Sequence, residues 1–251
     1  MLAYSLTYSL TQVLRYRSPP ADFVYTRESV VAFRRPFLTK RVAEVEAVLA
    51  ALSQKATPPA AVAALLAEAD ASGPPALIGH SFGATTMMLV CQRLQAINPR
   101  VAVLLDPWSF AASEAECERG VPQPVGCVMS EAWTANKELF AVKAMLRRCP
   151  HLLATLCARG SRHQSISDTA TWAPGLMAVK MGARGEREDA HATRRAMAEA
   201  CHVLIQRTLL HASPAASPSM EAELLESLCS ESRKVLRPFV PAVDMEMRAS
   251  T

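Results

Sequence analysis

The chain has 251 residues, of which 50% are apolar and 20% charged, and its formal net charge is +4. A chain of this length and composition buries a full hydrophobic core, which excludes an intrinsically disordered protein. Its basic residues are scattered and only 6% of its residues are aromatic, whereas a nucleic-acid-binding surface needs clustered basic side chains with aromatic rings among them.

The seven cysteines are widely spaced and include no C-x-x-C pair. This spacing indicates neither a zinc site nor a disulfide framework, and it favours a reducing compartment. The segment 1–17 lacks the apolar core and cleavage site of a secretory signal, and no stretch reaches the ~18 uninterrupted apolar residues of a transmembrane helix. We therefore expect a cytoplasmic protein that can lie peripherally on a membrane, and secretion only if the chain is N-terminally incomplete.

The first predicted elements lead up to a glycine-flanked serine. Apolar residues recur at helical spacing over 38–52, which predicts an amphipathic helix, and the Ala-rich stretch 60–70 predicts a short second one. Residues 76–78 then form a short apolar run after two prolines, which is typical of a buried strand. Apolar positions return to helical spacing from 84 to 94. The residues in between therefore connect a strand to a helix.

This connection reads Gly79-His80-Ser81-Phe82-Gly83, a G-x-S-x-G pattern. A serine on a sharp strand-to-helix turn has its Oγ lifted clear of the sheet, where a histidine can reach it. Glycines suit positions 79 and 83 if the strand and helix backbones approach each other closely there. The alternative is an ordinary turn that contains a serine, so the later elements have to decide between the two interpretations.

Those later elements alternate between strands and helices. They are a buried strand over 101–105, a long loop or lid over 107–124, a strand over 125–129, a helix from a cap at Thr134 to 148, a strand over 151–158, a helix capped by Asp189 to about 210, a linker over 213–219 and an amphipathic helix near 220–236. The alternation predicts a parallel α/β sheet rather than a helical bundle or a β-sandwich.

An acid and a base follow the serine in the order that a serine hydrolase needs. Asp106 comes directly after the strand 101–105, and His163 lies in the loop after the strand 151–158. Because parallel strands end at one edge of the sheet, we expect Ser81, Asp106 and His163 to meet there as a catalytic triad. Taken singly, Asp106 can also be a turn or helix cap and His163 a solvated loop side chain.

Four blocks then carry a family resemblance: GHSFGA with the apolar helix behind it, LLDPWSF at 104–110, PQPVGCVMSE at 122–131 and RGSRHQSISD at 159–168. In this order and spacing they resemble the plasma and type II platelet-activating factor acetylhydrolases, which are calcium-independent α/β-hydrolases, from about residue 23 to about 210. The resemblance implies an α/β-hydrolase domain over 1–211, with a mostly parallel sheet flanked by helices. A linker and a C-terminal amphipathic helix are expected over 212–251.

The resemblance also implies roles for individual positions. By position it makes Ser81 the nucleophile, Asp106 the acid, His163 the base, the Phe82 N–H an oxyanion-hole donor, and Trp108 and Phe110 the border of the acyl pocket. The family draws its second oxyanion donor from a strand and a His-Gly loop upstream of the serine. Residues 1–22 contain no glycine and no such motif, so we expect the sheet to lack the family's N-terminal strands.

The activity that the resemblance implies is removal of a short or oxidised sn-2 acyl group from platelet-activating factor-like phospholipids, with no metal and no cofactor. Such a substrate lies at a membrane or lipoprotein surface, and the family places an apolar surface helix where this chain has Trp172, Leu176 and Met177. The alternative is that these three side chains pack on the sheet. Two other functions stay open: a general short-chain carboxylesterase or polyester hydrolase, and a catalytically weak remnant that binds lipid or a partner.

Overall fold

The computed structural model describes residues 19–53, 73–93, 98–186, 188–210 and 218–239. In this part of the chain five strands form one sheet, in the order of their numbering: β1 (Ala76–His80), β2 (Val101–Leu105), β3 (Val125–Ser130), β4 (Leu152–Ala158) and β5 (Leu236–Pro238). The strands β1 to β4 are parallel, and β5 pairs with β4 in the antiparallel direction. The mostly parallel sheet predicted from the sequence is confirmed.

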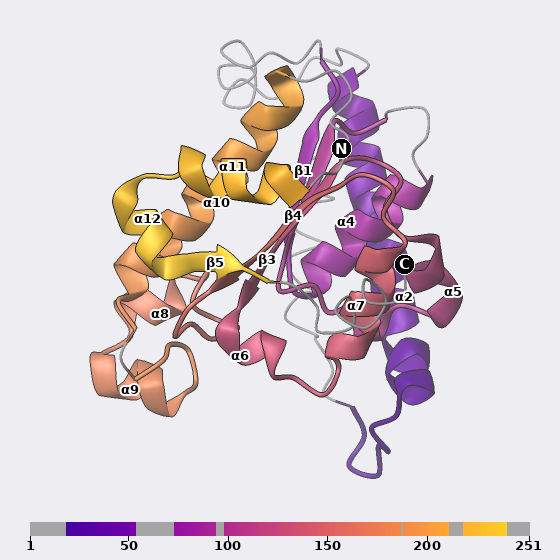
Figure 1. Cartoon of the computed structure of the whole chain (residues 1–251). Helices are drawn as coiled ribbons and strands as arrows, with labels where there is room; N and C mark the ends of the chain where they lie inside the picture. The colour runs from indigo at the N-terminus through magenta and orange to yellow at the C-terminus, as the bar shows by residue number, and fades with distance from the viewer. Residues whose placement is uncertain (1–18, 54–72, 94–97, 187, 211–217, 240–251) are drawn as a thin grey trace, which may run out of the picture.

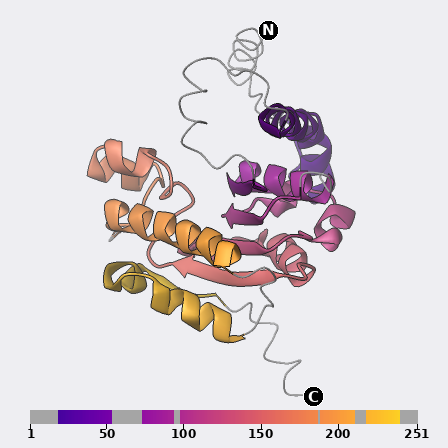
Figure 2. The same ribbon diagram turned by 90° about the horizontal axis from the view of Figure 1, so that it is seen from above.

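Helices cover both faces of this sheet (Figure 1). They are α2 (Arg27–Ser53), α4 (Phe82–Arg93), α5 (Glu114–Arg119), α6 (Glu131–Thr134), α7 (Leu139–Arg147), α8 (Thr169–Trp172), α9 (Gly175–Lys180), α10 (Ala190–Leu210), α11 (Pro218–Ser227) and α12 (Ser230–Val235), with a 3₁₀ turn at Ser109–Ala111. Figure 2 separates the layers, with α2 and α4 on one side of the sheet and α10, α11 and α12 on the other. The described part of the chain is therefore a three-layer α/β structure, consistent with the α/β-hydrolase fold.

The central strands are apolar throughout because both of their faces are covered. All five residues of β2 are buried, with Ala102 and Leu104 in the core beneath α4 and Val101, Val103 and Leu105 in the core beneath α10. Strands buried on both faces read as continuous apolar runs rather than alternating ones. The buried strand predicted over 101–105 is therefore confirmed.

The first helix starts eleven residues earlier than the periodicity predicts, at Arg27 instead of 38. Its buried face continues through Val30, Arg34, Leu38 and Val42 at intervals of four, and Arg34 is only 8% exposed. Because the charged Arg34 occupies a buried position and Pro36 follows it, apolar spacing alone does not predict the first part of this helix. The stretch 60–70, where a second helix was expected, lies outside the described residues.

The predicted long loop over 107–124 is also more structured than expected. It holds the 3₁₀ turn and α5, which begins at a capping box between Ser113 and Glu116. The helix expected from a cap at Thr134 to 148 begins later, at Leu139, as α7. The cap at Thr134 is wrong, because Thr134 is the last residue of the preceding short helix α6. Residues 213–217 of the expected linker lie outside the described part of the chain.

The predicted helix near 220–236 is likewise divided, here into α11, α12 and the short strand β5. Leu224 of α11, Leu228 between α11 and α12, and Leu236 of β5 are buried in the core beneath α10. The segment therefore docks on its own sheet. None of the helices that the structure describes is long and apolar enough to cross a bilayer.

Candidate active site

Ser81 stands alone between a strand and a helix, on the sharp turn that the motif predicts. It follows β1, precedes α4 and has a φ of 57°, a left-handed conformation that non-glycine residues seldom adopt and that costs free energy. Besides the bonds that its carbonyl accepts from α4, two backbone hydrogen bonds join it to the end of β2 and the loop behind it: its N–H donates to the Leu105 carbonyl at 2.9 Å, and its carbonyl accepts from the Trp108 N–H at 3.2 Å. The end of β2 thus fixes the turn that follows β1.

The two glycines of the motif have different reasons to be there. A Cβ at Gly79 would lie 2.5 Å from the Gly83 carbonyl oxygen, so the backbones of strand and helix leave no room for a side chain. A Cβ at Gly83 would meet nothing within 4 Å. The strand and helix backbones therefore approach closely, as expected, but only Gly79 lacks room for a side chain. The expectation of no room at Gly83 is wrong, because a Cβ there would point into open space.

Asp106 follows β2 directly and is 1% exposed. Its Oδ1 accepts a hydrogen bond from the Ser130 N–H at 2.6 Å, and its Oδ2 accepts one from the Ser130 hydroxyl at 2.6 Å. Hydrogen bonds to a carboxylate are stronger than neutral ones and compensate the cost of burying its charge. Like Ser81, Asp106 has a positive φ, of 42°. The ends of β2 and β3 together aim this carboxylate.

His163 connects the serine to the aspartate. Its Nε2 lies 2.8 Å from Ser81 Oγ and its Nδ1 lies 3.1 Å from Asp106 Oδ2. Because the carboxylate can only accept, Nδ1 carries the proton and Nε2 accepts from the serine hydroxyl. The three residues predicted to meet at the ends of β1, β2 and β4 form one hydrogen-bonded chain, in the order that proton transfer from the serine requires.

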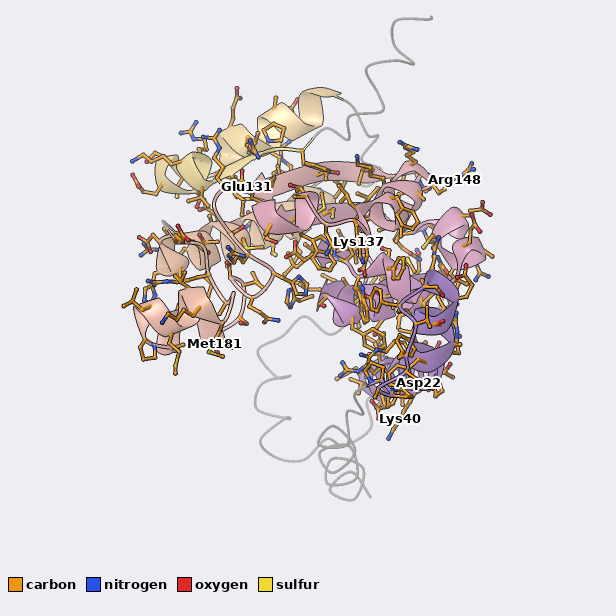
Figure 3. All side chains as sticks on the ribbon, turned by 90° about the horizontal axis from the view of Figure 1, so that it is seen from below. Asp22, Lys40, Glu131, Lys137, Arg148 and Met181 are labelled. Carbon is orange, nitrogen blue, oxygen red and sulfur yellow. The ribbon has the colours of Figure 1, made fainter. Side chains whose placement is uncertain are left out.

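The loop that carries His163 is held by its own Ser161 and by Glu131 of α6. The Ser161 hydroxyl donates to the Ala158 carbonyl at 2.6 Å and accepts from the Glu131 N–H at 3.2 Å. The Glu131 carboxylate accepts from the Gly160 N–H at 2.9 Å and from Arg237 of β5 at 2.6 Å. Glu131, labelled in Figure 3, therefore joins α6, this loop and the C-terminal strand.

Three residues around the chain of hydrogen bonds were not predicted from the sequence. Ser130 ends β3, so the rule that found Asp106, a polar residue at the end of a buried strand, would also have found it. His80 Nε2 lies 2.9 Å from the His163 carbonyl oxygen, and the Trp133 ring stacks on the His163 ring at 4.3 Å between centroids. No pattern in the sequence points to the stacking of Trp133.

The predicted oxyanion and pocket residues lie next to Ser81. Phe82 is the first residue of α4, where backbone N–H groups have no partner within the helix. Its ring is 6.0 Å from that of Trp108, whose Nε1–H donates to Glu138 Oε2 at 2.7 Å. Phe110 is 8% exposed and stacks on Tyr25. These aromatic side chains form one cluster beside the serine.

Glu138 holds this cluster together and was also missed. Its other oxygen, Oε1, accepts from the Tyr25 hydroxyl at 2.5 Å, so one largely buried carboxylate fixes two of the aromatic rings. Burial, and then the hydrogen bond and negative charge of Glu138, raise the pKa of Tyr25 well above its usual value. Tyr25 consequently stays a neutral hydroxyl that donates to Glu138.

The predicted surface segment near 172–177 breaks into α8 and α9 around Pro174. Leu176 is 81% exposed and Met177 54% exposed, so the alternative that these two side chains pack on the sheet is wrong. Met181, at the rim of the molecule in Figure 3, is 63% exposed. The side chain of Trp172 lies outside the described part of the structure.

His80, Asp106 and His163 are also close enough together to present three ligand atoms to a metal ion, within 4.8 Å of one another. In the described structure, however, His80 Nε2, both oxygens of Asp106 and both nitrogens of His163 already have hydrogen-bond partners. The donor set is thus arranged for proton transfer rather than for a metal.

Residues 6–213 match the model of a protein family described as platelet-activating factor acetylhydrolase, isoform II. The chain belongs to this family. Among solved structures, a ferulic acid esterase from Streptomyces cinnamoneus is similar, with 12% identity and a TM-score of 0.56. The similarity covers 82% of this chain and 55% of that one, so the chain spans little more than half of the esterase's length, and at this identity the likeness concerns the fold alone. A search of curated proteins finds no match.

Proposed function

We propose that this member of the acetylhydrolase family is a serine ester hydrolase with Ser81, His163 and Asp106 as its catalytic triad. The observation that carries the proposal is the continuous hydrogen-bonded chain from Ser81 Oγ through His163 to Asp106 Oδ2, with steps of 2.8 and 3.1 Å. Ser81 is presented on a strained turn at the edge of the sheet where open α/β folds place their sites.

In this mechanism His163 Nε2 takes the proton of Ser81 as Oγ attacks the ester carbonyl. The Asp106 carboxylate, which Ser130 holds through two hydrogen bonds, orients the imidazole and stabilises the imidazolium that forms. The Phe82 N–H at the start of α4 donates to the oxyanion. His163 then returns the proton to the leaving alcohol, and water hydrolyses the acyl-enzyme with His163 again acting as the base.

The proposed substrate is a phospholipid with a short or oxidised sn-2 acyl chain, as in platelet-activating factor. Family membership supports this class, and so does the aromatic cluster beside Ser81. Trp108 and Phe110 are tied into neighbouring elements through Glu138 and Tyr25, so the wall that they form next to the serine is rigid. A rigid wall favours a short acyl group over a long one.

The proposed location of the reaction is a membrane or lipoprotein surface, with the protein cytoplasmic and peripherally bound. Leu176 and Met177 of α9, together with Met181, expose apolar side chains beside the basic Lys180. Apolar side chains that enter the interface next to basic ones favour binding to anionic lipid.

Labelling with a fluorophosphonate probe tests the triad, with Ser81→Ala as the unlabelled control. Labelling of Ser81 in folded protein is expected, and its absence would leave the remnant that binds lipid or a partner as the better description.

Rates on a 2-acetyl phospholipid in vesicles and on p-nitrophenyl butyrate then test the substrate. A kcat/KM that favours the phospholipid supports the proposal, whereas a preference for the soluble ester would indicate a general short-chain carboxylesterase.

Variants of α9 test the interfacial part independently. Leu176→Ser with Met177→Ser removes exposed apolar surface and touches no residue of the triad. We expect weaker binding to phosphatidylserine-containing vesicles and an unchanged kcat on p-nitrophenyl butyrate. Vesicle binding equal to that of the wild type would reject α9 as the lipid-binding segment.

A further inference from the structure

His163, the proposed catalytic base, lies on a loop, and its side chain is more exposed to solvent than that of Asp106. Its side chain is 25% exposed, whereas that of Asp106 is 1% exposed. The hydrogen bond to Asp106, at 3.1 Å, is the longer of the two that the ring makes within the triad. Two hydrogen bonds to opposite nitrogens still allow the ring to tilt about the line that joins them. Contacts outside the triad are therefore needed to fix the ring and its backbone.

His80 fixes the backbone. Its Nε2 lies 2.9 Å from the His163 carbonyl oxygen, and since a carbonyl can only accept, Nε2 carries the proton and donates. Because His80 is the residue before Ser81, this bond joins the turn of the nucleophile directly to the loop of the base. The separation of Ser81 Oγ and His163 Nε2 is thus set by a short bridge rather than through the whole sheet.

Trp133 fixes the ring. Its indole is nearly parallel to the His163 imidazole, at 19° with centroids 4.3 Å apart. Within the described structure the buried Trp133 Nε1–H has no hydrogen-bond partner, so this side chain is held by packing of its ring and not by a polar contact. The helix that carries it is tied to the same loop, because the Ala132 N–H donates to the Ser161 carbonyl at 3.1 Å.

The charges of the two contacts suit a base that becomes positive during the reaction. Burial, and next the positive charge of a protonated His163, lower the pKa of His80, so His80 stays neutral and does not repel an imidazolium. The face of an indole attracts a cation. Both contacts therefore remain favourable when His163 takes the proton from Ser81.

We propose that His80 and Trp133 are positioning residues for the catalytic base: His80 holds the backbone of His163 through its Nε2–H, and Trp133 holds the imidazole plane by stacking. This inference rests on the proposed function, because it assigns a purpose to the orientation of His163. Misplacement of a catalytic group by about 1 Å can cost as much as about 10²-fold in rate.

Two pairs of variants separate positioning from simple packing. His80→Gln keeps an N–H donor at a similar reach, whereas His80→Met has a similar shape and no donor. Trp133→Phe keeps a flat ring, whereas Trp133→Leu does not. His151→Met is the matched control, since His151 is an exposed histidine at the other end of β4.

We expect His80→Met and Trp133→Leu to lower kcat on p-nitrophenyl butyrate by about 10- to 10²-fold with KM within twofold of wild type. His80→Gln and Trp133→Phe should recover most of the lost kcat, and His151→Met should behave as wild type. Circular dichroism and thermal unfolding check that each variant is folded. The inference is overturned if the conservative variants lose as much as the others, or if kcat stays within twofold in His80→Met and Trp133→Leu.

A second measurement needs no turnover. We expect the proton between His163 Nδ1 and Asp106 to give a downfield resonance in proton nuclear magnetic resonance spectra, which His163→Gln would identify by its loss. We expect the signal to broaden or shift in Trp133→Leu and His80→Met and to persist in the conservative variants. If wild type shows the signal but fails to hydrolyse esters, the proposed function is wrong. The effect of the variants on the signal still tests whether His80 and Trp133 position His163. An unchanged signal in all four variants would reject positioning alone.

Discussion

The turn after β1 carries Ser81 and the loop after β4 carries His163, and the two side chains meet in one hydrogen bond. The turn and the loop are held in place by different kinds of interaction. The turn is fixed by its backbone, through one residue at a φ of 57° and hydrogen bonds to Leu105 and Trp108. The loop is fixed by side chains of Ser161, Glu131 and Glu188, two of which come from other parts of the chain. We therefore expect the turn of Ser81 to tolerate almost no substitution, whereas the loop of His163 is supported by several separate contacts and should tolerate the loss of one.

The sharpest test of this difference is Gly79→Ala, for which we expect the largest effect. The new Cβ would lie 2.5 Å from the Gly83 carbonyl oxygen, so strand and helix must separate and Ser81 must move. We expect a loss of stability of about 1–3 kcal/mol or more and a fall in kcat of about 10²-fold. Urea unfolding and ester hydrolysis measure the two effects.

Gly83→Ala is the matched control, because the same methyl group meets nothing there within 4 Å. Alanine also favours a helix over glycine by roughly 0.5–1 kcal/mol. We expect wild-type activity and equal or higher stability. Equal losses in the two variants would show that the turn does not depend on the contact at Gly79.

The same contrast explains how much the sequence reveals. The strand ends, Ser81, Asp106 and His163 follow from local pattern, because apolar runs and the residues right after them are determined by neighbours in sequence. Trp133 cannot be predicted in this way, since its contact with His163 depends on how α6 leaves β3. The early start of α2 is hidden for a related reason: Arg34 occupies a buried position that periodicity assigns to an apolar residue.

Ser130→Ala tests the link between the two regions and should have the next largest effect. It removes the hydroxyl that donates to Asp106 Oδ2 at 2.6 Å and keeps the backbone donor to Oδ1. Losing a hydrogen bond to a buried charge costs about 1.5–3 kcal/mol. If about 1.4 kcal/mol of this loss raises the activation free energy, kcat falls about tenfold. Ser130→Thr, which keeps a hydroxyl, is the control. An unchanged kcat in Ser130→Ala would mean that the backbone N–H alone orients Asp106.

Glu188→Gln tests the base loop and should have a smaller effect. Glu188 Oε2 accepts from the Ser165 hydroxyl at 2.8 Å and from the Gly185 N–H at 2.6 Å, and a glutamine oxygen can still accept both bonds without the charge. We expect a stability loss of about 0.5–1.5 kcal/mol and a kcat within roughly threefold of wild type. A loss of activity as large as that of Gly79→Ala would remove the distinction between the two regions.

The smallest effect on activity is expected at an ion pair outside both regions, where pH can be used as the probe. Arg35 of α2 contacts Glu116 of α5 at 2.7 Å. Burial acts to raise the pKa of Glu116, but hydrogen bonds from Arg35 and Ser113 outweigh it and lower the pKa from 4.5 to about 2. A carboxylate with a lowered pKa contributes stability above its unfolded value, and this contribution is lost as the pH falls from about 4.5 towards 2.

Glu116→Gln removes this titration and leaves the other carboxylates in place. We therefore expect wild type to be more stable than the variant at pH 7, and this advantage to shrink between pH 5 and pH 3, with no change in kcat at pH 7. Urea unfolding of both proteins at several pH values measures it. Because Arg35 is 34% exposed, solvent screens the pair and the advantage is modest. A constant difference across this range would mean that the charge of Glu116 contributes nothing to stability through its ion pair with Arg35.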